Sequence, residues 1–100
     1  MAGSKRTPSS QSKHNKEVKR LANKYKDKGY QVEADILGYT QPQTVRGFRP
    51  DIKAKKGKQE TIIEVETLDS VDSTRDLKQK DAFQDWSSQD KNRHFKRKIV

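Results

Sequence analysis

Cysteine is absent from the 100-residue sequence, and so are long apolar segments. Without cysteine the chain can form no disulfide and no thiolate metal site, which favours an intracellular protein. No apolar run approaches the ~18 residues of a membrane-spanning helix, and the N-terminus lacks the apolar core of a signal peptide. We therefore expect a cytoplasmic protein that does not interact with membranes.

Apolar residues and histidine are also scarce. Hydrophobic residues make up 28% of the chain and charged residues 37%, so the predicted core is small. The two histidines, His14 and His94, are too isolated to indicate a histidine-based metal site. The sequence has no glycine-rich phosphate loop, no zinc-ligand spacing and no nucleophile beside an evident base, so most enzyme classes lack support.

Positive charge is what the sequence has in excess. Lysine and arginine total 23 against 14 aspartate and glutamate residues, which gives a net charge of +9. A basic domain favours polyanionic partners, because binding to phosphates releases counterions. Nucleic acid is therefore the first predicted partner, with general solubility as the alternative explanation of the charge.

Composition divides the chain into a short arm and one domain. Residues 1–12 are rich in serine and lysine and predict a disordered basic arm, whereas residues 13–100 predict a single domain. A helix is predicted over residues 13–28, with Ser12 as its N-cap and Gly29 at its end. The apolar spacing that predicts this helix comes from Val18, Leu21, Ala22 and Tyr25.

The rest of the chain predicts an α/β (α+β) domain in which a small mixed sheet is flanked by helices. Alternating patterns predict strands, an amphipathic pattern predicts a second helix with Ser73 as its cap, and a loop of residues 38–49 separates the first two strands. Gly57 marks an antiparallel hairpin whose second strand is apolar on both faces, as in a central strand. The predicted strands are 30–37, 50–55, 59–67 and 93–100, and the second helix is 73–89.

Three carboxylates meet in this predicted hairpin. Asp51 begins one strand, and Glu64 and Glu66 end the other, so a turn at Gly57 brings them together. Glu64 and Glu66 are two residues apart, about 6.7 Å along a strand, and they point to the same face. Crowded carboxylates repel one another unless a cation lies between them, and Mg²⁺ prefers such ligands. The cluster predicts a Mg²⁺ or Mn²⁺ site suited to metal-assisted phosphodiester hydrolysis. A solvated strand face that balances nearby lysines is the alternative.

The stretch "RPDIKAKKGKQETIIEVET", residues 49–67, resembles the core signature of the PD-(D/E)XK, or restriction-endonuclease-like, nuclease superfamily. Pro50 and Asp51 match its Pro-Asp, and Glu64 matches the first member of its Glu-x-Lys. The order of elements is similar to that of archaeal Holliday-junction resolvases over residues 13–100. This resemblance implies an αβββαβ core and a metal-dependent DNA endonuclease, and it also implies that Glu17 and Gln79 face the site.

Glu66 departs from the signature, because the family has lysine at that position. Three explanations remain open: the second carboxylate works as a base or metal ligand, a cation comes from elsewhere, or the site no longer cuts. Candidates for the replacement cation, which are also candidate DNA contacts, are Lys53, Lys55, Lys78 and Lys80.

Arg46 and Arg49 precede Asp51 in the long loop and are predicted to contact phosphates. Family analogy and the small core favour a homodimer, and the resemblance implies a preference for branched DNA. Two other functions remain open: a nucleic-acid-binding module of the same fold that does not cut, and a small interaction subunit of a larger assembly.

Overall fold

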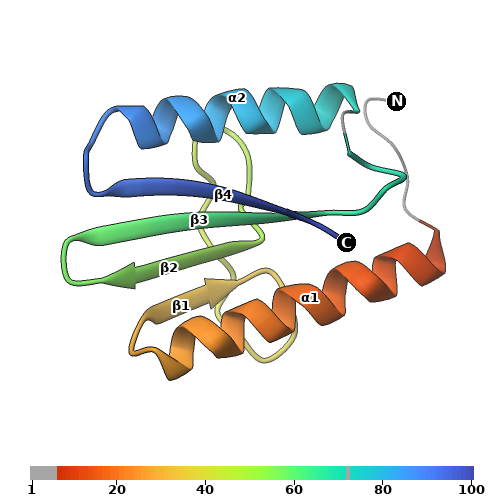
Figure 1. Cartoon of the computed structure of the whole chain (residues 1–100), viewed down its shortest axis with the longest axis horizontal. Coiled ribbons are helices and arrows are strands. Elements are labelled where there is room, and N and C mark those ends of the chain that lie inside the picture. Colours follow the sequence, from red (N-terminus) through yellow and green to blue (C-terminus); the bar gives the residue numbers. More distant parts are fainter. Residues whose placement is uncertain (1–6, 72) are drawn as a thin grey trace.

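The centre of the fold is a four-stranded sheet with one helix on each side (Figure 1). The computed structural model describes residues 7–71 and 73–100. This architecture confirms the predicted α/β fold with a small mixed sheet between helices. The elements in chain order are α1 (Pro8–Asp27), β1 (Gln31–Ala34), β2 (Ile52–Lys56), β3 (Gln59–Glu66), α2 (Thr74–Ser88) and β4 (Arg93–Ile99).

The strands follow one another across the sheet in the order β1-β2-β3-β4. β1 pairs antiparallel with β2, and β2 pairs antiparallel with β3 through the hairpin at Gly57, whose φ is +59°. β3 and β4 run parallel, with α2 as the connection between them. Ile52 lies opposite Ile63, so the last residues of β3 stand beside the residues that lead into β2.

Helix α1 begins earlier than the apolar pattern predicts. The Thr7 side chain accepts a hydrogen bond from Ser10 N–H, and Pro8 occupies the first helical turn, where its missing N–H costs nothing. Thr7, rather than Ser12, is therefore the N-cap. Residues 8–12 of the predicted arm are helical, and residues 1–6 lie outside the described part of the chain.

Strand β3 is buried on both faces, as its two-sided apolar pattern predicts. One face packs under α1, which contributes Val18, Leu21 and Ala22. The other face packs under α2, where Ile62 meets Phe83 and Trp86. Within the described residues, neither helix has the length and apolar character needed to cross a membrane.

The first strand ends sooner than predicted, at Ala34 rather than at residue 37. Leu37 is 98% exposed, so the alternating pattern does not continue as a buried strand face. The chain instead enters a long loop that reaches β2 at Ile52. Val45 and Phe48 form an isolated bridge and pack against the core beneath α2, which anchors the middle of this loop.

Candidate functional site

Asp51 and Glu64 are in direct contact. The pairing of Ile52 with Ile63 places Asp51, the residue before β2, opposite Glu64. The backbone N–H of Asp51 donates a hydrogen bond to Oε2 of Glu64 over 2.6 Å. The hairpin thus joins the two acidic positions that the sequence pattern places together.

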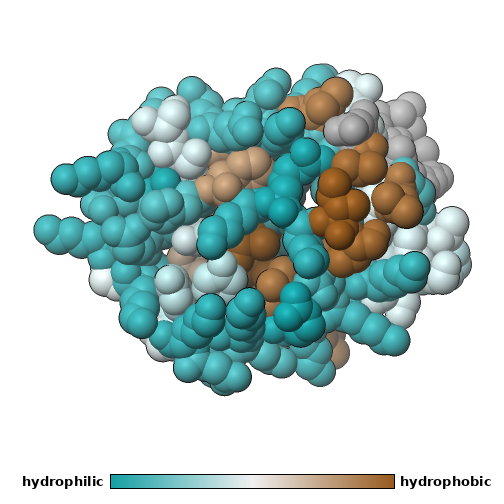
Figure 2. Space-filling view, viewed as in Figure 1, coloured by the Kyte–Doolittle hydropathy of each residue, from teal (hydrophilic) through white to brown (hydrophobic). Residues whose placement is uncertain are grey.

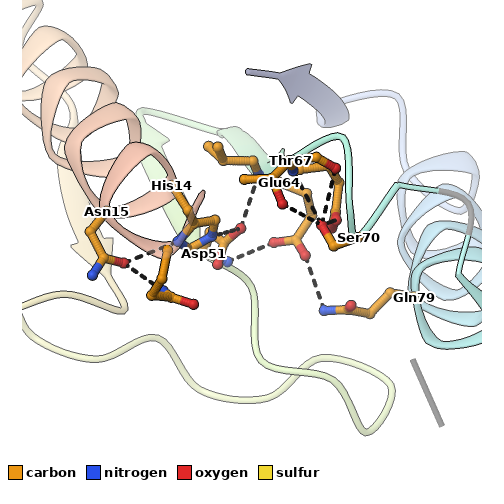
Figure 3. A network of polar contacts seen from close by, with 10 residues as sticks. His14, Asn15, Asp51, Glu64, Thr67, Ser70 and Gln79 are labelled. Carbon is orange, nitrogen blue, oxygen red and sulfur yellow. Dashed lines mark hydrogen bonds and ion pairs between the residues drawn. The ribbon is translucent and has the colours of Figure 1, made fainter. Parts of the chain in front are cut away.

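Glu64 lies at the centre of a polar network (Figure 3). Its side chain is nearly inaccessible, with 4% of the residue exposed, although the second oxygen, Oε1, accepts a hydrogen bond from the Gln79 amide over 3.0 Å. Burial, followed by the negative charge of Asp51, raises the pKa of Glu64 well above its usual range, and Glu66 adds to the effect. The site therefore places an acidic group where its ionised form is unfavourable without a compensating positive charge.

Asp51 is held from the side of α1. Its Oδ2 accepts a hydrogen bond from Val65 N–H over 2.9 Å and lies 3.2 Å from Nε2 of His14. His14 is buried, and its Nδ1 lies 3.1 Å from Oδ1 of Asn15 (Figure 3). The sequence analysis missed this contact. A signal exists, because His14 is one helical turn before the buried Val18 and so belongs to the same stripe of α1.

Glu66 is the third carboxylate, and it is also buried. Its Oε2 accepts a hydrogen bond from the Ser70 hydroxyl over 2.8 Å. Ser70 in turn accepts a hydrogen bond from Thr67 N–H over 3.2 Å, so the turn after β3 holds Glu66 in place (Figure 3). Position 66, where the resemblance of the hairpin sequence implies a lysine, thus carries a carboxylate with a defined hydrogen-bond partner.

The three carboxylates line one cleft of about 280 Å³. The same cleft includes Arg49 and Gln79, which the sequence analysis singled out, and Asp35 and Arg75, which it missed. The full lining is Asp35, Arg49, Asp51, Glu64, Glu66, Arg75 and Gln79. Arg75 is four residues before Gln79, a spacing that places both on one face of α2. Two arginines therefore line the same cleft as the acidic residues, and its space is large enough for a small polar group.

The family model described as REase_AHJR-like, which is restriction-endonuclease-like and of the archaeal Holliday junction resolvase type, matches residues 6–86. The chain belongs to this family. No curated protein and no solved structure gives a significant match to the chain. Every residue that lines the cleft falls within the matched range. Membership of this REase-like family agrees with the resemblance in the hairpin sequence, and it associates the chain with nucleases.

Glu17 lies outside the cleft, although the resemblance suggests that it faces the site. Both oxygens of Glu17 accept hydrogen bonds from the Arg20 guanidinium, over 2.9 and 2.6 Å. This contact lowers the pKa of Glu17. His14 is the α1 residue that reaches the acidic cluster instead, because it stands about one helical turn before Glu17 and points to Asp51.

Several basic residues singled out as DNA contacts also lie outside the cleft. Arg46 pairs with Asp85 of α2, and Lys53 lies 3.6 Å from Glu60. Lys53 and Lys55 line a separate groove on β1 and β2. Lys78 and Lys80 belong to α2 but are not among the residues that line the cleft. Arg49 is the exception, since it lines the cleft while its guanidinium donates to the carbonyl of Pro42.

The donor set of the cleft fits a hard divalent cation. Carboxylate oxygens are the ligands that Mg²⁺ and Mn²⁺ prefer, and burial together with the negative charge of Asp51 raises the pKa of Glu64, an effect that a bound cation would offset. As arranged among residues 7–71 and 73–100, no group of three or more His, Asp or Glu side chains could hold a metal ion. Their oxygens instead accept hydrogen bonds from Gln79, Ser70 and backbone N–H groups.

Proposed function

We propose that this chain is a metal-dependent endonuclease that hydrolyses phosphodiester bonds of DNA. The observation that supports the proposal is the cleft in which Asp51, Glu64 and Glu66 face Arg49 and Arg75, within a chain of the REase-like family. The excess positive charge of +9 would favour a polyanionic substrate.

Asp51, Glu64 and Glu66 would hold Mg²⁺ or Mn²⁺. Such an ion supplies a water of lowered pKa and offsets negative charge that develops on the phosphate. Neighbouring groups would set the geometry: the His14 side chain and the backbone N–H of Val65 contact one oxygen of Asp51, and the Gln79 amide donates to one oxygen of Glu64. Arg49 would position a phosphate at the entrance by charge-assisted hydrogen bonds.

We also propose a homodimer that acts on branched DNA. Figure 2 shows an apolar patch at the end of the molecule where β3 leads into α2. Exposed apolar residues at this end are Leu68 at 80%, Leu77 at 44% and Ile99 at 49%. Large exposed apolar side chains grouped in this way are typical of an interaction surface, and a second copy would cover it. A dimer would place two clefts on one substrate, which suits DNA with two equivalent strands to cut.

A nucleic-acid-binding module that does not cut is the second candidate function. The observation that favours it is Glu66, since a carboxylate occupies the position of the family's lysine and is hydrogen-bonded to Ser70. A binding module would keep the basic surface without using the acidic cleft.

Cleavage assays separate the two functions. Four-way junction, flap, single-stranded and linear duplex DNA are incubated with the protein in Mg²⁺, in Mn²⁺ and in EDTA, and binding is measured in Ca²⁺. We expect metal-dependent cleavage that Asp51→Ala abolishes and that Asp81→Ala, an exposed change on α2, leaves intact. Binding of DNA without cleavage in either metal would contradict the endonuclease and support the binding module.

The dimer is tested separately by sedimentation equilibrium. We expect Leu77→Lys to convert a dimer to a monomer, whereas Leu37→Lys, at an equally apolar but distant loop position, leaves the dimer unchanged. A monomer at micromolar concentration for the unaltered protein would contradict the dimer.

A further inference from the structure

The acidic cleft lacks a lysine where the family signature has one. Position 66 holds a buried glutamate whose carboxylate accepts a hydrogen bond from Ser70. Phosphodiester hydrolysis increases the negative charge on the phosphate oxygens, and a fixed cation beside them lowers the barrier. A working nuclease with this cleft therefore needs a cationic side chain from another position.

The four lysines that the sequence suggests for this role do not line the acidic cleft. Lys53 is 3.6 Å from Glu60, and with Lys55 it lines a groove on β1 and β2 rather than the acidic cleft. Lys78 and Lys80 are on α2 but do not line the cleft. The two cations that do line it are both arginines, Arg49 and Arg75.

The surroundings distinguish these two arginines. Arg49 belongs to the long loop, and its guanidinium donates to the carbonyl oxygen of Pro42, which commits part of the group to holding the loop. Arg75 is in the first turn of α2 and is exposed, and within the described residues no carboxylate forms an ion pair with it. Its guanidinium is therefore available to a ligand in the cleft.

The position of Arg75 relative to the carboxylates is fixed by its helix. Gln79, one turn further along α2, donates its hydrogen bond to Glu64 over 3.0 Å, so this helix face lies against the acidic cluster. Side chains four residues apart on a helix lie about 5–6 Å apart at Cβ. A long and flexible arginine at position 75, which lines the same cleft, is thus placed near a phosphate that enters it.

We propose that Arg75 replaces the missing motif lysine as the group that stabilises negative charge on the phosphate during hydrolysis. This inference rests on the proposed endonuclease function. The guanidinium would bind two phosphate oxygens in its fork and keep its charge throughout, since a guanidinium group is not deprotonated in proteins. It stabilises charge and does not act as the base.

In the chemical step, a carboxylate of the cleft accepts a proton and Arg75 stabilises negative charge. The oxygen of a water molecule bonds to phosphorus, and the bond from phosphorus to the leaving oxygen breaks with its electron pair. The water loses one proton to a carboxylate of the cleft, and the leaving oxygen gains one proton from solvent. Arg75 is unchanged at the end, and the carboxylate returns its proton to solvent.

The test is a double-mutant cycle between positions 75 and 66. We expect Arg75→Ala to lower kcat by about 10²–10³, as for loss of one donor to a developing oxyanion. Arg75→Lys should recover part of this loss because it keeps the charge. Glu66→Lys restores the Glu-x-Lys of the signature and leaves Asp51 and Glu64 as metal ligands, so in this background the same Arg75→Ala change should cost less than about tenfold, because the introduced lysine supplies the charge.

Binding and stability measurements separate a role of Arg75 in catalysis from a role in DNA binding or in folding. In Ca²⁺, Arg75→Ala should reduce the slope of log affinity against log salt by no more than about one, as for one phosphate contact. Lys91→Ala removes one exposed charge from the turn before β4, away from the cleft, and should leave kcat unchanged. The melting temperature should be unchanged in both variants, since both side chains are exposed.

Each outcome decides the inference. Cleavage by Arg75→Ala at the unaltered rate, or a loss that appears entirely in KM, would overturn the role of Arg75 and leave the endonuclease function intact. An equal loss from Arg75→Ala in both backgrounds would show that position 75 does not substitute for position 66. Absence of metal-dependent cleavage by the unaltered protein would overturn the proposed function itself, and with it this role.

Discussion

Removing the Gln79 side chain should destabilise the protein because it leaves a buried carboxyl group with one donor fewer. The Gln79 amide donates to Oε1 of Glu64 over 3.0 Å, and 4% of Glu64 is exposed. Water therefore has little access to the oxygen that the alanine in Gln79→Ala would leave without its partner. The cost should depend on pH, since burial and the negative charge of Asp51 raise the pKa of Glu64, and a hydrogen bond to its ionised form is the stronger one.

The free energy of unfolding lost in Gln79→Ala depends on the charge of the Glu64 carboxyl group that accepts the hydrogen bond. A lost hydrogen bond between neutral groups costs about 1 kcal/mol, and one to a charged group costs about 1.5–3 kcal/mol. We expect the lower figure in acid, where Glu64 is protonated, and the higher figure in alkali, where it is ionised. For a domain of this length, about 1 kcal/mol corresponds to a change of about 4–8 °C in melting temperature.

Thermal unfolding in EDTA at a series of increasing pH values measures how this cost changes as Glu64 ionises. Gln84→Ala is the matched control, because Gln84 is an exposed glutamine on the same helix and its backbone carbonyl, which accepts from Ser87, is retained. We expect Gln79→Ala to melt below Gln84→Ala at every pH, with a gap that widens as the pH rises. Equal melting temperatures for the two variants would refute the stabilising role of the amide.

Three further predictions concern stability. Hydrogen bonds from the Thr67 hydroxyl, the Ser10 hydroxyl and Thr7 N–H lower the pKa of Asp69 to about 2. The unaltered protein should therefore be more stable than Asp69→Asn above pH ~4, and acid titration followed by circular dichroism should show this advantage disappearing towards pH ~2. Phe83→Ala should cost about 3–5 kcal/mol in urea unfolding, because Phe83 is fully buried against Phe48 and Phe95. Mn²⁺ at 100 times its dissociation constant should add about 2.7 kcal/mol of stability in calorimetry, and an unchanged melting temperature would contradict a metal site.

The hairpin could be predicted because the residues that determine its geometry lie close together in the sequence. Alternation sets which side chains share a face, Gly57 sets the turn, and together they place Asp51 opposite Glu64. The start of α1 was less predictable, because the apolar stripe begins later than the helix. Thr7 and Ser10 are held by Asp69, which is distant in sequence, so a tertiary contact supports the first turn.

The rest of the cleft depends on contacts that no local pattern contains. Arg75 and Asp35 enter it because α2 and the long loop pack at the same end of the sheet. The resemblance suggests Glu17 on α1, but the rotation of the packed helix brings His14 to Asp51 and leaves Glu17 with Arg20. Helical periodicity predicts which stripe is buried, but not which residue of the stripe meets a given strand.

The net charge of the chain is strongly positive, but it does not neutralise the carboxylates of the cleft. The stability of the folded chain should therefore depend on pH. Burial and neighbouring carboxylates raise the pKa of Glu64, so the folded state holds a proton that the unfolded chain releases at lower pH. Stability of the metal-free chain should therefore fall as pH rises from the unfolded pKa, about 4.3, to the raised folded pKa. Many of the lysines are exposed on the outer surface, where solvent screens them from this site. A cation bound in the cleft would offset the same repulsion directly, so the arrangement that makes the folded chain less stable is also the one that favours a divalent metal.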